Sequence, residues 1–156
     1  RVLTIFVLVC GLLFSTLTQD LAIARGPPGK EIMNASITAG AILPANSIIL
    51  SHPENGFWIE YWSGRQAFLD GWPERTPDIA ERWASAQAIW HSQDIMQARG
   101  LVYKNGIGAL AITDDMRNGL VWDLPEQDLL FLLRNNETFK NAYHSYSVDI
   151  WTVNPR

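Results

Sequence analysis

The chain has 156 residues and a mass of 17.6 kDa, which is the size of one ordinary domain. Its 12 basic and 16 acidic residues give a net charge of −4, which argues against a nucleic-acid-binding protein, and its 47% apolar content excludes an intrinsically disordered chain. The single cysteine, Cys10, excludes an intramolecular disulfide and a zinc site built from cysteines.

The N-terminal segment is an uncharged apolar run over residues 2–19, bounded by Arg1 and Asp20. As a helix, a run of this length spans about 27 Å, close to the roughly 30 Å hydrocarbon core of a bilayer. We therefore predict a transmembrane helix over residues 1–24. The alternatives are a secretory signal peptide, because Ala22-Ile23-Ala24 fits a cleavage-site pattern, and a buried core helix.

The rest of the chain divides into two parts. Residues 25–46 are predicted to form a linker, rich in proline and glycine at its start, and a short helix over 31–43. Residues 47–156 are predicted to form the folded domain. Because Arg1 precedes the apolar run and an acidic domain follows it, we expect the domain on the extracytoplasmic side of a membrane that the chain crosses once.

Short apolar runs predict the strands of this domain. They cover residues 47–50, 66–69, 107–113 and 148–153. Helical patterns lie between them, so the fold class is α/β, with one small domain and a mainly parallel sheet. Residues 52–56 are expected to form a loop after the first strand.

The helices are predicted from periodicity and capping residues. Residues 57–63 favour a helix, and Thr76-Pro77-Asp78 marks the start of the next one. Its apolar face contains Ile79, Trp83, Ala86 and Trp90. A further helix, capped by Ser92, is predicted to end at Asn105-Gly106, and residues 125–134 favour another, with acids first and Arg134 last.

Polar residues follow the predicted strands, at the edge where an open α/β sheet usually binds its ligand. They are His52, Glu54, Asn55, Glu60, Asp70, Asp114 and Asp115. The alternative is that these residues only cap turns and helices. His91 and Asp94 lack a third metal ligand at suitable spacing, and no nucleotide-binding or nucleophile-elbow motif occurs, so we predict neither a metal nor a cofactor.

Aromatic residues are concentrated in the first half of the domain. Within 33 residues the chain has Trp58, Trp62, Trp72, Trp83 and Trp90. Carbohydrate stacking, a belt at a membrane surface and ordinary core packing all remain open, although Trp83 and Trp90 lie on a helix face that must be buried.

A family resemblance rests on residues 48–65, IILSHPENGFWIEYWSGR, and on Phe68-Leu69-Asp70. This pattern resembles the start of the extracytoplasmic C-terminal domain of GT-C membrane glycosyltransferases, which depend on polyprenyl-phosphate sugars. The family includes oligosaccharyltransferase catalytic subunits and protein mannosyltransferases. Later stretches fit as well, so the resemblance covers residues 2–153: Gly106-Ile107, 131–133, Phe139, Tyr143 and 148–153.

The resemblance implies a binding domain without catalytic residues of its own. In the family, the catalytic acids lie between the N-terminal transmembrane helices, so no catalytic residue is carried over to this chain. Oligosaccharyltransferases also have a WWDYG motif that helps to recognise the acceptor; the motif is absent here, and residues 57–61, FWIEY, are the nearest string. The candidate ligand-binding or partner-binding residues are His52, Glu54, Asn55, Trp58, Glu60, Arg65 and Asp70.

Our first hypothesis is therefore a membrane-anchored, non-catalytic extracytoplasmic domain resembling the tail of such a glycosyltransferase. The alternative is a single-pass accessory or scaffold subunit of a respiratory, photosynthetic or translocating membrane complex. A third possibility is a small secreted enzyme that uses His52, Glu54 and Asp70. The expected partners are membrane lipid and other membrane protein chains, with no nucleic acid and no cofactor.

Overall fold

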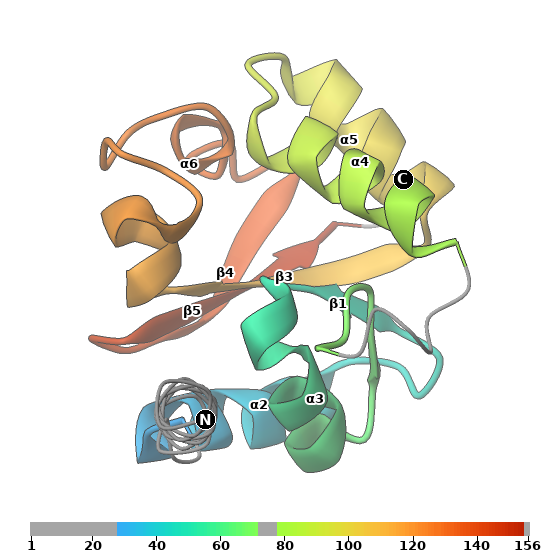
Figure 1. Ribbon diagram of the computed structural model, residues 1–156, viewed down its shortest axis with the longest axis vertical. Coiled ribbons are helices and arrows are strands. Elements are labelled where there is room, and N and C mark those ends of the chain that lie inside the picture. The colour runs from blue at the N-terminus through green and yellow to red at the C-terminus, as the bar shows by residue number, and fades with distance from the viewer. Residues whose placement is uncertain (1–27, 72–77, 155–156) are drawn as a thin grey trace, which may run out of the picture.

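The computed structural model describes residues 28–71 and 78–154, which form a five-stranded sheet with helices on both faces (Figure 1). The strand order is β2-β1-β3-β5-β4. In chain order the elements are α2 (Lys30–Ile42), β1 (Ile48–Leu50), α3 (Pro53–Ser63), β2 (Gln66–Ala67), α4 (Ile79–Trp90), α5 (Ile95–Lys104), β3 (Ile107–Thr113), the π-helical turn η2 (Met116–Leu120), α6 (Leu129–Leu132), β4 (Phe139–His144) and β5 (Val148–Val153).

Two predictions lie outside these ranges. One is the transmembrane helix over residues 1–24, and the other is the helix start at Thr76-Pro77. Neither segment is among the described residues. Of the helices that are described, none is both long enough and apolar enough to cross a bilayer.

The α/β class is confirmed, but the sheet is mixed rather than mainly parallel. Strands β2, β1 and β3 are parallel neighbours, whereas β5 is antiparallel to both β3 and β4. The sequence analysis missed β4, an edge strand without a continuous apolar run. Because only residues 145–147 connect β4 to β5, the two strands must pair as an antiparallel hairpin.

Strand β3 is the centre of the sheet and is buried on both faces. Ala109 and Ala111 pack in the core cluster that includes residues of α2 and α3, and Leu110 and Ile112 pack in the cluster that includes residues of α4 and α5. Side chains alternate between the two faces of a strand, so a doubly covered strand needs apolar residues at every position. This explains why the strand was predicted correctly from the run at 107–113.

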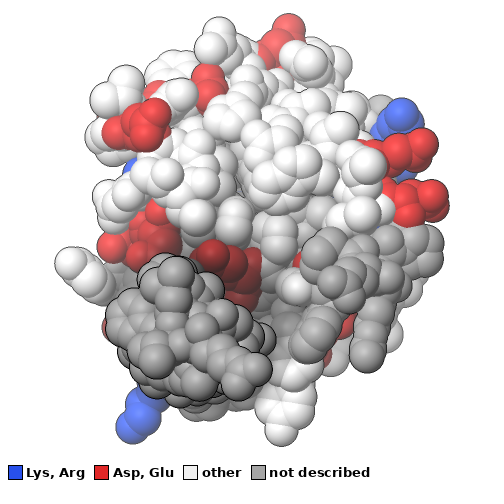
Figure 2. Space-filling view, viewed as in Figure 1, with Lys and Arg blue, Asp and Glu red and all other residues white. Residues whose placement is uncertain are grey.

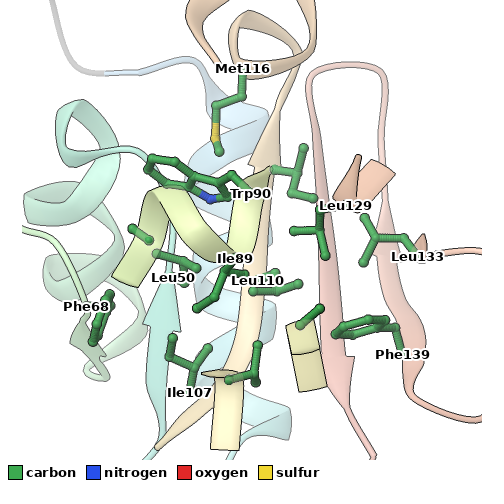
Figure 3. Packing of buried hydrophobic residues seen from close by; sticks show 14 of the residues in the cluster. Leu50, Phe68, Ile89, Trp90, Ile107, Leu110, Met116, Leu129, Leu133 and Phe139 are labelled. Atoms are coloured by element: carbon green, nitrogen blue, oxygen red, sulfur yellow. The ribbon is translucent and has the colours of Figure 1, made fainter. Parts of the chain in front are cut away.

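The larger core cluster lies between the sheet and the α4–α5 layer. Figure 3 shows Trp90 next to Met116 at the end of this cluster where β3 finishes. The Trp90 side chain is almost fully buried, and its backbone carbonyl accepts a hydrogen bond of 3.0 Å from the indole of Trp122, which is also buried. The C-terminal end of α4 is therefore fixed by both packing and hydrogen bonding.

The opposite layer, α2 and α3, is built around small residues. Ala35 and Ala39 of α2 are buried with Ala109 and Ala111 of the sheet. A side chain at Gly40 of α2 would place its Cβ only 2.3 Å from the Ser63 carbonyl oxygen of α3. At the other end of α2, the Glu31 carboxylate accepts a hydrogen bond of 2.9 Å from the Ser147 N–H in the β4–β5 turn.

Helix α3 begins earlier than predicted, because residues 53–56 form its first turn instead of a loop. Pro53 occupies the first helical position, where its missing N–H costs nothing, and His52 caps the helix. The loop prediction treated Pro53, Asn55 and Gly56 as turn residues. Gly56 is instead needed for contact, because a Cβ there would lie 2.1 Å from the Leu69 carbonyl oxygen.

Helices α4 and α5 match the predicted periodicity with two differences. Ala86 and Trp90 are buried as expected, but Trp83 keeps 39% of its surface exposed. The cap of α5 is Asp94, whose carboxylate accepts hydrogen bonds from the N–H groups of Met96 and Gln97, and Ser92 only supports the Asp94 backbone. Gly106 follows α5 with a φ of +66°, which confirms the predicted glycine end of this helix.

The predicted helix over residues 125–134 is reduced to the single turn α6. Asp128 has a φ of +50°, a conformation that interrupts a right-handed helix. Its carboxylate accepts a hydrogen bond from the Gln93 amide and lies 3.0 Å from His91, both in the connection after α4. A tertiary contact thus overrides the local helical preference of this segment.

We predict opposite effects for two helical glycine substitutions. Gly56→Ala should lower the free energy of unfolding by about 1–3 kcal/mol, because the new methyl group would clash with the Leu69 backbone. Gly100→Ala in α5 is the matched control; it meets nothing within 4 Å and should stabilise the chain by about 0.5–1 kcal/mol. Urea unfolding midpoints measure both, and equal stabilisation by the two substitutions would contradict the tight packing of α3.

Candidate functional site

The parallel strands β2, β1 and β3 end at the same edge of the sheet. His52 lies two residues after the end of β1, Asp70 three residues after the end of β2, and Asp114 directly after β3. The backbone at Leu69 and Asp70 lies against Gly56 in the first turn of α3. Of the seven candidate residues, this arrangement brings His52, Glu54, Asn55 and Asp70 to one edge, which we call the strand-end edge.

His52 is held at this edge by aromatic rings and by its own helix. Its Nδ1 accepts a hydrogen bond of 3.4 Å from the Glu54 N–H. Its ring stacks on Trp90 with a centroid distance of 6.2 Å and meets Trp83 edge-on at 6.1 Å. Burial lowers the pKa of His52 from its ordinary value, and the charge of Glu54 opposes this shift. The folded protein therefore favours a neutral imidazole at this position.

Asn55 takes part in a short chain of polar contacts beneath the edge. Its amide donates a hydrogen bond of 3.5 Å to the Ser51 hydroxyl, which in turn contacts the Met116 sulfur at 3.6 Å. The Met116 N–H donates to the hydroxyl of Thr113 at the end of β3. These contacts connect the ends of β1 and β3, so Asn55 is tied to the core on one side.

Glu60 and Arg65 have structural contacts away from the strand-end edge. The Glu60 carboxylate accepts a hydrogen bond of 2.9 Å from the Ala67 N–H in β2. The Arg65 guanidinium donates to the Leu43 carbonyl at 2.9 and 3.2 Å, and also to the Gly40 carbonyl. Arg65 thereby satisfies carbonyl groups at the C-terminal end of α2, which otherwise lack partners. A binding role for both residues stays a prediction.

Trp58 belongs to a different surface. Together with Phe57, Tyr61 and Trp62 it forms a group of stacked and edge-on rings on α3. Gly56, Ile59 and Ser63 are the buried residues of the same helix. The aromatic segment recognised in the sequence is therefore an outward-facing part of α3. Trp72, also in the predicted aromatic cluster, lies outside the described residues.

The chemistry available at the strand-end edge is polar recognition. It offers a neutral imidazole, an amide and carboxylates, which can form hydrogen bonds with a polar ligand. Within the described residues, no group of three or more His, Cys, Asp or Glu side chains could hold a metal ion.

The sequence analysis missed two further polar clusters, because each joins residues distant in the chain. Asp149, almost fully buried in β5, is paired with both Arg117 of η2 and His144 of β4. The second cluster consists of Asp128, His91 and Gln93. It borders a shallow pocket of about 300 Å³. Its lining residues are Gln93, Glu126, Gln127, Asp128, Phe131 and Leu132.

No family model and no curated protein matches this sequence. Among solved structures, the chain is similar to the C-terminal globular domain of an oligosaccharyltransferase from Archaeoglobus fulgidus. The two superimpose with a TM-score of 0.62 at 12% identity, over 83% of this chain and 100% of that domain. The chain has the fold of an oligosaccharyltransferase C-terminal domain. The resemblance stated from the sequence is thus confirmed for the fold.

A second structure is that of an oligosaccharyltransferase of the same organism, tethered to an acceptor peptide with an NVT sequon. The TM-score is 0.49 at 14% identity, and the match covers 83% of this chain but only 19% of that longer chain.

Arg65→Met tests the structural role of Arg65. Because the substitution leaves the carbonyls of Gly40 and Leu43 without their charged donor, we expect the free energy of unfolding to fall by about 1.5–3 kcal/mol. Arg134→Met is the matched control, because it removes an ion pair with Glu126 in which the Arg134 side chain is 62% exposed and the Glu126 side chain is 59% exposed. This substitution should lower the free energy of unfolding by less than about 1 kcal/mol. Equal losses in urea unfolding would show that Arg65 does not hold α2.

The lowered pKa of His52 predicts a pH dependence of stability. Since the unfolded chain binds the proton more tightly than the folded one, stability should decline as the pH falls from about 6.5 towards the lowered pKa of the folded state. His52→Asn keeps a good helix cap and does not titrate, so its stability should decline less over this interval. Unfolding midpoints measured at several pH values test this, and parallel curves for the two proteins would refute it.

Proposed function

We propose that this chain is the extracytoplasmic tail domain of a membrane glycosyltransferase of the GT-C kind, which uses a polyprenyl-phosphate-linked sugar. The observation that carries this proposal is the superposition on the whole of an oligosaccharyltransferase C-terminal domain. The aromatic segment of α3 and the strand-end edge lie in the part of the chain on which the sequence resemblance rests.

In this proposal the domain supports glycosyl transfer but does not perform it. The polar residues that stand out in the sequence already have structural partners. The Nδ1 atom of His52 accepts the bond that caps α3, Glu60 binds the β2 backbone, and Arg65 binds the end of α2. Groups occupied in this way are suited to positioning a surface, whereas a catalytic acid or base needs its reactive atom available to the substrate.

The strand-end edge is the surface that we assign to contact with the acceptor or with the rest of the enzyme. In open α/β sheets, ligands bind at the carboxyl ends of the parallel strands. Strands β1, β2 and β3 supply such ends here, and His52, Asn55 and Asp70 lie there. This assignment favours recognition of a polar group by hydrogen bonds.

Membrane attachment is also part of the proposal. It is supported by the uncharged run over residues 2–19, which has nearly the length of a bilayer core. A folded domain attached to such a run would lie close to the membrane surface, where a polyprenyl-linked donor is held.

Extraction from the native membrane in mild detergent tests this function. An antibody against the domain should detect a polypeptide several times heavier than 17.6 kDa, and the purified material should transfer sugar from a polyprenyl-phosphate donor. A polypeptide near 17.6 kDa in a large assembly without transferase activity would overturn the proposal in favour of an accessory subunit. Recovery in the soluble fraction would overturn the membrane attachment.

A further inference from the structure

The outer face of α3 consists almost entirely of aromatic rings. Phe57, Trp58, Tyr61 and Trp62 form an arrangement of two columns, which we call the α3 quartet. Along the helix, Phe57 stacks with Tyr61 at 6.3 Å and Trp58 stacks with Trp62 at 5.1 Å. Between the columns the rings meet edge-on. Residues four apart lie on the same side of a helix, so the quartet forms one continuous surface.

This surface is exposed although it is apolar. Tyr61 is 71% exposed and Phe57 is 47% exposed, while Trp58 and Trp62 are partly buried. The residues of α3 that pack on the protein are on its opposite side. A cluster of large aromatic side chains in water is unfavourable, and such patches usually mark a contact surface.

The α2–α3 layer has exposed apolar side chains beyond the quartet. Between Lys30 and Arg65 the only charged residues are Glu31, Glu54 and Glu60, and Glu60 is bound to the β2 backbone. Ile37 and Ile42 of α2 are about half exposed. Both helices of this layer thus have exposed apolar side chains.

The sequence before the described residues indicates what the α3 quartet contacts. The uncharged run over residues 2–19 is joined to Lys30, the start of α2, by residues 20–29. A segment of that length reaches at most about 35 Å when fully extended. Because α2 packs directly against α3, an anchored run would keep the α2–α3 layer near the membrane. The quartet is the exposed aromatic surface of this tethered layer.

We propose that the α3 quartet lies in the headgroup region of the bilayer and orients the domain on the membrane. Trp and Tyr favour this region, because their rings enter the apolar boundary while the N–H or O–H stays hydrated. The charge of the domain favours a zwitterionic surface, since acidic residues outnumber basic ones, as they also do on the face in Figure 2. The inference rests on the membrane attachment proposed above.

A fluorescent label at position 61 tests this contact. The chain over residues 1–156, with Cys10→Ser and Tyr61→Cys, would be labelled with an environment-sensitive dye and reconstituted in phosphatidylcholine vesicles. Met96→Cys is the matched control, because Met96 is 69% exposed on α5 and so nearly equals Tyr61 in exposure. We expect blue-shifted emission and quenching by brominated lipid at position 61, and quenching by aqueous iodide alone at position 96.

Flotation of the same vesicles separates the possible failures. If the chain floats with the vesicles but iodide quenches both labels equally, the membrane attachment stands and the quartet contact is wrong. If position 61 is protected from both iodide and brominated lipid, another protein surface covers the quartet, which also overturns the lipid contact. If the chain does not float, the membrane attachment and this inference fail together.

Discussion

Helix α3 fits against its neighbours only because two glycines allow backbone to meet backbone. Gly40 lets α2 approach the Ser63 carbonyl of α3, and Gly56 lets α3 approach the segment after β2. Arg65 then donates hydrogen bonds to the Gly40 and Leu43 carbonyls that this approach brings near. These contacts set the position of α3 between α2 and β2, so they also set where its first turn and its aromatic face lie.

The position of α3 divides its residues between two surfaces. Its N-terminal turn brings His52, Glu54 and Asn55 to the strand-end edge, where the rings of Trp83 and Trp90 enclose the imidazole. Its outer face presents the α3 quartet on the α2–α3 side of the sheet. A single short helix would thus serve both the proposed polar recognition and the proposed membrane contact, and this segment contains most of the residues that suggested a function.

Prediction from the sequence succeeded where burial leaves a simple pattern. The strand over residues 107–113 was found because it is a continuous apolar run, and the helix over 31–43 was found because its apolar residues recur at the helix period. It failed at β4, which is an edge strand, and at residues 125–134, where Asp128 bonds to His91 and Gln93 and interrupts the helix. A binding role for Glu60 and Arg65 stays a prediction, and nothing local in the sequence reveals that both side chains also bond to backbone groups of β2 and α2.

The sequence by itself determined the α/β class, the central strand, the net negative charge and the resemblance that the fold comparison confirms, because these depend on composition and local sequence patterns. Only the tertiary structure decided that the sheet is mixed, which candidate residues share an edge, and that the aromatic segment faces outward. Those features depend on close contacts between distant segments, such as Gly56 with Leu69 and Gly40 with Ser63, whose geometry no single stretch of sequence contains.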